Sequence, residues 1–193
     1  MLSDANAPSS TSTTDESVAN DLALVSPDRQ FLQLYLEAET PALLSILHLV
    51  EIISIPMGQV VPIFQMPPWV MGVYNCRGDV LWMVDLNQLL GFSPWYQQKG
   101  YISKHTTVIV RSRSRNTSSD ANLVLGLVVN RVEGILLCDP DYIEPSSQFE
   151  NVHSLKPFVS GYWTKSNNQL YRILNADVIL DAIHPTDQAL NAS

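Results

Sequence analysis

An apolar segment over residues 68–86 constrains the fold more than any other part of the chain. Its two halves, residues 70–76 and 80–84, are rich in Val, Tyr and Trp, which suit the pleated surface of a β-strand. Arg77-Gly78-Asp79 separates them, and its glycine can adopt the positive φ of a tight turn. The segment therefore predicts a β-hairpin. Because nearly every position in both arms is apolar, we expect both faces to be covered, as in a central hairpin of a closed barrel rather than at an edge.

The tip of this hairpin is polar, in contrast to its arms. A buried arginine needs partners, so we expect Arg77 to lie at or near solvent. At the other end, Asp85 can cap a short helix over residues 86–90, with Gln88 three residues on as in a capping box and Gly91 as a left-handed stop. This pattern favours capping over catalysis as the role of Asp85.

The rest of the chain reads as short strands joined by turns. The strands predicted from alternating or continuous apolar runs are residues 30–36, 43–46, 60–64 (an edge or an end because of Pro62), 106–110, 123–129, 132–137, 158–163 and 170–174. A short helix is predicted over residues 47–53, with Glu51 exposed on it, and Asn175 is expected to cap a last helix. Residues 144–157 read as a loop. The sequence predicts an all-β fold with short helices.

Composition bounds the domain organisation and the class of function. Residues 1–27 and 185–193 are polar and predict disordered tails around one folded domain, residues 28–184. A net charge of −8 disfavours nucleic acid as a partner. The sequence carries no signal peptide and no segment long and apolar enough to cross a membrane, so we expect a cytoplasmic protein without direct membrane insertion.

Residues for catalysis or metal binding are sparse. The two cysteines, Cys76 and Cys138, are too few for a disulfide scaffold, and both sit in apolar runs that predict reduced, buried thiols. None of the four histidines stands at a metal-ligand spacing from another histidine or a cysteine, and no nucleotide-binding motif is present. We therefore predict neither an enzyme nor a bound metal or cofactor.

The hairpin also carries a family signature. Residues 72–78, Gly-Val-Tyr-Asn-Cys-Arg-Gly, followed by an apolar strand and Asp85-Leu86, resemble the pattern G-V-x-N-x-R-G, strand, D-L of the CheW-like adaptors. The order of elements from about residue 30 to 183 is similar too. The resemblance implies two five-stranded SH3-like β-barrels in one chain. It also implies a non-catalytic adaptor between the cytoplasmic tip of a chemoreceptor-type protein and the regulatory domain of a CheA-like histidine kinase, associated with the membrane only through receptor arrays.

Receptor contact in this family maps to a groove between the barrels. The resemblance carries this contact to six positions here: Leu49, Glu51, Gly72, Arg77, Gly126 and Val132. Among these, the aliphatic side chains would offer apolar surface to a helical tip, the arginine a planar fork, and the glycines close backbone approach. No kinase-binding residue is assigned. The pathway implied is chemotaxis or, slightly favoured by divergence such as Cys76 in place of the usual Leu, twitching or phototactic motility.

Two other classes of function remain open from the residues alone. One is a stand-alone β-barrel module that binds a ligand or regulates a partner, with a pocket lined by Trp69, Trp82 and Trp163. The other is an enzyme with Cys76 as nucleophile, although the sequence supplies no evident base for it.

Overall fold

The computed structural model describes residues 26–98, 103–113, 123–146 and 157–183. The predicted tails lie outside these ranges except for residues 26 and 27. The strands are β1 (Gln30–Tyr35), β2 (Pro41–Ser45), β3 (Leu49–Pro56), β4 (Val70–Cys76), β5 (Asp79–Asp85), β6 (Lys104–Arg111), β7 (Val124–Val129), β8 (Arg131–Leu137), β9 (Glu144–Pro145), β10 (Val159–Thr164) and β11 (Leu170–Leu174). The α-helices are α2 (Leu86–Leu89) and α3 (Ala176–Asp181), and single 3-10 turns are η1 (Pro27–Arg29), η2 (Ile46–His48), η3 (Met57–Gln59), η4 (Trp95–Gln97) and η5 (Pro140–Tyr142). The all-β prediction is confirmed.

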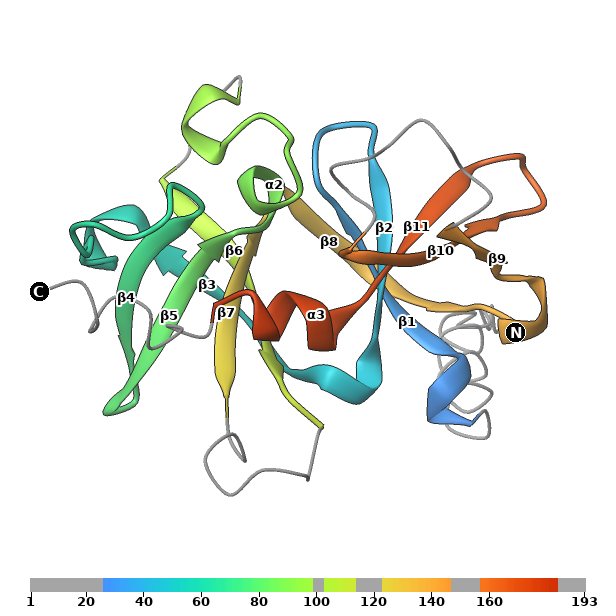
Figure 1. Cartoon of the computed structure of the whole chain (residues 1–193), viewed down its shortest axis with the longest axis horizontal. Helices are drawn as coiled ribbons and strands as arrows, with labels where there is room; N and C mark the ends of the chain where they lie inside the picture. The colour runs from blue at the N-terminus through green and yellow to red at the C-terminus, as the bar shows by residue number, and fades with distance from the viewer. Residues whose placement is uncertain (1–25, 99–102, 114–122, 147–156, 184–193) are drawn as a thin grey trace, which may run out of the picture.

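The strands form two curved sheets that lie side by side, with α3 across the seam between them (Figure 1). The first sheet has the order β8-β1-β2-β11-β10-β9, and the second has the order β3-β6-β7-β5-β4. Two parallel pairings, β2 with β11 and β5 with β7, join segments far apart in the chain. These sheets match the predicted pair of SH3-like barrels, except that, over the described ranges, no hydrogen bonds between end strands close either barrel. The first sheet has a sixth strand because Glu144–Pro145, predicted as loop, pairs with β10.

Because successive side chains of a strand point to opposite faces of the sheet, the apolar side chains form three hydrophobic clusters. The central cluster lies between the sheets and draws on both, for example Leu34 of β1, Leu127 of β7 and Ile179 of α3. The first inner cluster is built from residues of the first sheet and Cys138 just after it, and the second inner cluster is built from residues of the second sheet. In β7, Leu125, Leu127 and Val129 join the central cluster, whereas Val128 joins the second inner cluster.

The predicted hairpin is present as β4 and β5, but its place in the sheet differs from the prediction. Arg77 (φ 57°) and Gly78 (φ 101°) both take positive φ, as a two-residue turn matching the strand twist requires. However, β4 is an end strand, because β5 pairs on its other side with β7. On the outer side of β4, the described residues form only an isolated bridge, between Val61 and Val73. That bridge is all that the structure shows of the strand predicted over residues 60–64.

The helix predicted over residues 47–53 is wrong. Only η2 is helical there, and from Leu49 the chain is β3, paired along its length with β6. Its β-branched residues favour a strand, and a short apolar run fits the period of a strand as well as that of a helix. Along β3, Val50 and Ile52 are exposed while Glu51 is half-buried, so the predicted exposure of Glu51 is also wrong.

Both predicted helix caps are confirmed. The Asp85 carboxylate accepts hydrogen bonds from the N–H groups of Asn87 and Gln88 at the start of α2, and Gly91 takes φ 79° after it. The Asn175 side chain accepts from the N–H of Val178 at the start of α3.

Candidate functional site

The open side of the second sheet is bridged by an ion pair between two residues predicted to act together. Arg77, at the tip of the β4–β5 hairpin, donates to Glu51 Oε1 at 3.0 Å and to Oε2 at 2.8 Å. The guanidinium fork thus meets the carboxylate of β3 in the bidentate geometry that favours arginine over lysine. Side-chain exposure is 77% for Arg77 and 27% for Glu51, so the arginine is near solvent, as predicted. Screening by water limits such a pair to about 1 kcal/mol or less.

Beneath this pair lies a groove of about 600 Å³ that leads toward the second inner cluster. Its apolar lining includes Leu81, Ile109 and Val124, and its rim includes the ion pair and the exposed Val80. Cys76 also lines it, half-buried rather than buried as predicted. The groove therefore has an apolar floor, with the ion pair of Arg77 and Glu51 at its rim.

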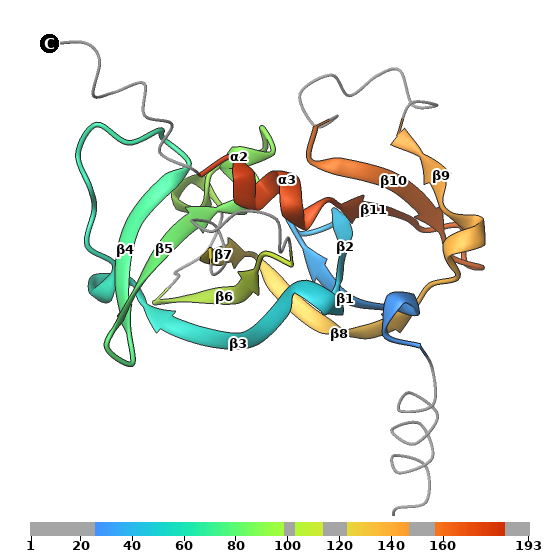
Figure 2. The same cartoon turned by 60° about the horizontal axis from the view of Figure 1, so that its bottom comes forward.

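A second surface lies beside it, along the end strands of the two sheets. Leu49 on β3 and Val132 on β8 are both half-buried and pack against the central cluster. The two strands run along the same side of the molecule (Figure 2). The sequence did not lead us to predict four exposed apolar residues on these strands: Val50, Ile52, Ile135 and Leu137. The alternation within residues 50–55, read as a helix face, was the signal for the first two.

The two predicted glycines are buried and serve packing within the protein. At Gly72 (φ +138°), a Cβ would lie 2.1 Å from the carbonyl oxygen of Val61, across the bridge that joins β4 to the preceding segment. At Gly126, a Cβ would lie 2.9 Å from Met83 Sδ and 3.0 Å from Thr107 Cγ2. The close backbone approach expected of both glycines is made inside this chain, and receptor contact by them stays a prediction.

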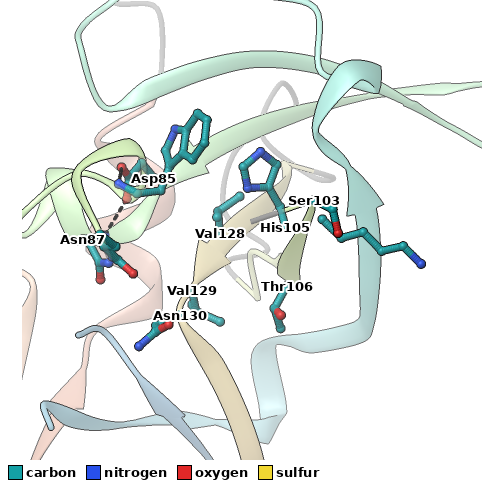
Figure 3. A pocket seen from close by; sticks show the side chains of 11 residues that line it. Asp85, Asn87, Ser103, His105, Thr106, Val128, Val129 and Asn130 are labelled. Carbon is teal, nitrogen blue, oxygen red and sulfur yellow. Dashed lines mark hydrogen bonds between the residues drawn. The ribbon is translucent and has the colours of Figure 1, made fainter. Parts of the chain in front are cut away.

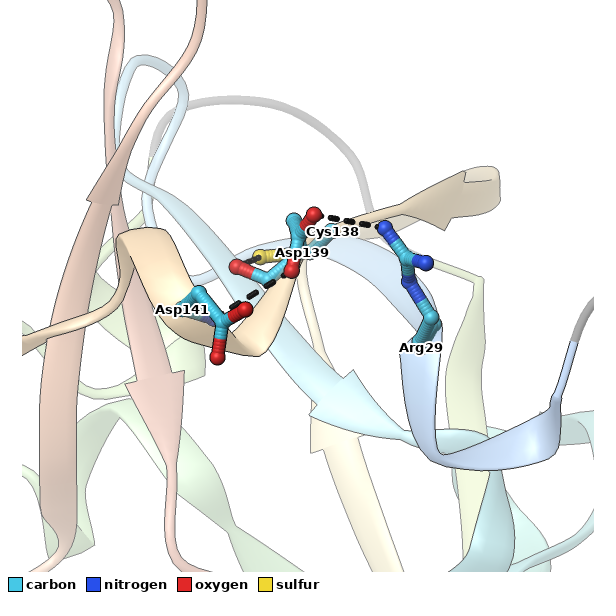
Figure 4. A network of polar contacts seen from close by, with 4 residues as sticks. All are labelled: Arg29, Cys138, Asp139 and Asp141. Atoms are coloured by element: carbon cyan, nitrogen blue, oxygen red, sulfur yellow. Dashed lines mark hydrogen bonds and ion pairs between the residues drawn. The ribbon is translucent and has the colours of Figure 1, made fainter.

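The three tryptophans of the ligand-binding alternative do not meet in one pocket. Trp69 and Trp82 pack against the central cluster, whereas Trp163 packs against the first inner cluster and lines a different cavity of about 350 Å³. That cavity is bordered by the pair between Arg29 and Asp139, 2.7 Å apart, which ties the start of β1 to the turn after β8 (Figure 4).

The cysteine next to this pair is shielded from solvent. Cys138 lies in the first inner cluster, where burial raises the pKa of its thiol to about 11. Its thiol is therefore protonated at neutral pH, the less nucleophilic form. Both cysteines are free of disulfide bonds, as predicted.

Other kinds of site leave little trace in the structure. Within the residues that the model describes, no three His, Cys, Asp or Glu side chains gather closely enough to hold a metal ion. Over the same residues, no helix has the length and apolar character needed to cross a membrane.

Comparisons with known proteins agree with the geometry. The family model of the CheW-like domain matches residues 30–184. Among solved structures, the scaffolding protein TtCheW from Thermoanaerobacter tengcongensis is similar with a TM-score of 0.60 and 21% sequence identity, over 77% of this chain and 89% of that one. At 21% identity, this similarity supports a shared fold and nothing beyond it. Among curated protein sequences, none matches significantly.

Proposed function

Because the chain belongs to the CheW-like domain family, whose members are non-catalytic chemotaxis scaffolds, we propose that it couples chemoreceptor-type proteins to a CheA-like histidine kinase. In this role it binds the cytoplasmic tip of the receptor on one surface and the regulatory domain of the kinase on another. It works in the cytoplasm and is held near the membrane through the receptor array. The pathway is chemotaxis or a related one for twitching or phototactic motility.

One observation supports the receptor surface above the others. The end strands β3 and β8 carry Leu49 and Val132, and the same strands expose Val50, Ile52, Ile135 and Leu137. Glu51 of β3 holds the ion pair with Arg77 at the edge of the adjoining groove, which Val50 also lines. A helical receptor tip has an apolar stripe and polar flanks, so it can lay its stripe on the strands and offer acceptors to the guanidinium.

The test is a calorimetric titration of this protein with a helical-hairpin fragment of a receptor tip from the same cell, and separately with the kinase regulatory domain. Arg77→Glu places two carboxylates side by side and removes the donor, so we expect receptor affinity to fall at least about tenfold. Binding of the kinase domain should not change, because it uses another surface.

The control is Arg113→Glu, which reverses an exposed charge after β6. It should leave both affinities unchanged. A folded Arg77→Glu protein that binds the receptor fragment normally would contradict the assignment of this surface. If neither partner binds the unchanged protein, the adaptor role itself is wrong.

A further inference from the structure

A cavity of about 280 Å³ on the second sheet is built around a structural carboxylate. Figure 3 shows Asp85 and Asn87 on one side of it, and His105 and Ser103 on the other. The two Asp85 oxygens accept from three backbone N–H groups, at 2.8 to 3.3 Å. These bonds hold α2 and η4 in place, so the role of Asp85 in this cavity is structural.

The cavity of about 350 Å³ on the first sheet differs, because exposed apolar and aromatic side chains line it. We call it the aromatic cavity, and its lining residues are Arg29, Leu137, Cys138, Asp139, Tyr142 and Trp163. Tyr142 is 73% exposed and Leu137 is 41% exposed, while Trp163 is half-buried. A partner can therefore contact these side chains without any change in the fold.

Contacts within the protein hold both aromatic residues of the cavity in place. The N–H of Tyr142 donates to the Asp139 carbonyl at 3.1 Å, and the Asp139 carboxylate is bound by Arg29 at 2.7 Å (Figure 4). The Trp163 ring packs on Tyr171, with ring centroids 5.6 Å apart. The cavity is thus formed before a partner arrives, which lowers the entropic cost of binding.

The surroundings of the aromatic cavity select among the conformations that a bound peptide can adopt. Addition of a strand is disfavoured, because the end strand β9 that follows η5 is only Glu144–Pro145, and its proline lacks an N–H. A helix docks through side chains spread over two turns, whereas this cavity lies near the lower end of ligand-site volumes. A polyproline II segment is narrow, needs no hydrogen bonds from a sheet and packs its prolines on aromatic side chains.

The charges around the cavity favour a basic partner. Arg29 and Asp139, the two charged residues that line it, pair with each other. Asp141 and Glu144, in and just after η5, are exposed, and neither carboxylate forms an ion pair with a described residue. Lys165, just after β10, does not line the cavity. An arginine or lysine beside the prolines would therefore meet two free carboxylates.

We propose that the aromatic cavity binds a basic, proline-rich segment of a partner protein in the polyproline II conformation. The prolines pack against Tyr142 and Trp163, and the basic side chain faces Asp141. Of the lining residues, Leu137 at the end of β8 is also part of the proposed receptor surface, and the others are not. This interaction is additional to the proposed adaptor role and does not depend on it.

The probe is a capped hexapeptide, Pro-Pro-Leu-Pro-Pro-Arg, titrated into the full-length protein and followed by NMR shifts of backbone and indole N–H groups. We expect saturable shifts centred on Tyr142 and Trp163. A peptide with alanine in place of the four prolines keeps the leucine and the charge but loses the preformed conformation, so its affinity should be at least about tenfold weaker. Glutamate in place of the arginine should weaken binding about threefold or more, through repulsion by Asp141 and Glu144.

Tyr142→Ala removes an exposed aromatic side chain from the cavity and should weaken the proline peptide at least about tenfold. The matched control is Tyr96→Ala, which removes a 60% exposed tyrosine of η4, outside the cavity, and should bind the peptide as the parent protein does. Should Tyr142→Ala fail to fold, the comparison of the proline and alanine peptides on the parent protein decides alone.

Three results would overturn the proposal: no saturable shifts, equal affinities of the proline and alanine peptides, or unchanged binding by a folded Tyr142→Ala protein. A fourth is a shift of the Tyr142 and Trp163 signals on dilution of the protein alone, which would assign the cavity to a second copy of this chain. The receptor and kinase titrations are separate measurements, so either proposal can fail without the other.

Discussion

Asp85 shows how one side chain can fix several segments. Its carboxylate takes three backbone N–H donors, two at the start of α2 and one at Trp95 ten residues on. We predict that Asp85→Ala lowers the free energy of unfolding by about 2–4 kcal/mol, since it removes a helix cap and leaves buried N–H groups unpaired. Urea unfolding measures the loss. Asp141→Ala, at an exposed position, should change stability by less than about 0.5 kcal/mol, and an equal loss in both variants would refute the role of Asp85.

His105 predicts how stability depends on pH. Burial lowers its pKa in the folded state below the ordinary 6.5, so the unfolded chain binds the proton more readily. Its contribution to stability is complete above pH 6.5 and is lost as the pH falls through the folded-state pKa. Asp85 acts in the opposite direction, because burial raises the pKa of its carboxyl above 3.8 and acidification relieves the cost of its charge.

The measurement that separates the two groups is the unfolding free energy of the parent and of His105→Gln between pH 5 and 8. We expect the stability difference between the two proteins to be constant above about pH 7 and to shift in favour of His105→Gln as the pH falls. Parallel pH curves for the two proteins would mean that the imidazole is not shielded from solvent.

Single residues also show which properties could be predicted from sequence. The cap at Asp85 and the exposure of Arg77 follow from local rules, since capping needs only near neighbours and a charge avoids burial. The partner of Arg77 could not be predicted locally, because Glu51 lies 26 positions away and its direction depends on β3 being a strand. Likewise, that Asn87 Oδ1 has no hydrogen-bond partner among the described residues becomes visible only once α2 is packed.

Among the elements, β4 depends on one glycine for its contact with the preceding segment. Val61 and Val73 exchange two backbone hydrogen bonds of 2.8 Å, and this approach leaves no room for a Cβ at Gly72. We predict that Gly72→Ala lowers the free energy of unfolding by about 2–4 kcal/mol, because it adds a backbone clash to an unfavourable positive φ. Chemical denaturation followed by Trp fluorescence measures it.

Gly58→Ala is the matched control, because a Cβ there meets nothing within 4 Å. It should be neutral or slightly stabilising through the lower entropy of its unfolded chain. If both glycine variants lose stability equally, the tight bridge between Val61 and Val73 is not what requires Gly72.

The elements that sequence reasoning misplaced share a cause. Strand β3 was read as a helix because a short apolar run fits both periods, and its long pairing with β6 decided the outcome. Strand β9 is two residues long and exists through its pairing with β10. The hairpin of β4 and β5 was predicted to within one residue of its bounds, but in the middle of a sheet, whereas β4 is an end strand. Its apolar arms do not reveal that β7 is the neighbour of β5.

In the whole molecule, the central cluster is shared between the two sheets. Leu32 and Leu44 come from the first sheet, Val108 and Leu127 from the second, and α3 lies over the seam between them. The resemblance to a known family was needed to anticipate two barrels, because no repeat in the sequence marks them. The ion pair of Arg77 with Glu51 and the end strands β3 and β8 lie at their open sides, where the predicted closure fails.

This shared cluster predicts that the two sheets unfold as one unit. Leu127 is fully buried in it, so Leu127→Ala should lower the free energy of unfolding by about 2–5 kcal/mol through lost burial and a residual cavity. Native-state hydrogen exchange should show the same loss of protection for core amides of β1 and β11 as for those of β6 and β7. Leu170→Ala, at a partly exposed position on β11, should cost less than about 1 kcal/mol. If Leu127→Ala weakens protection only in the second sheet, the barrels are independent units, and the central cluster is an interface between them.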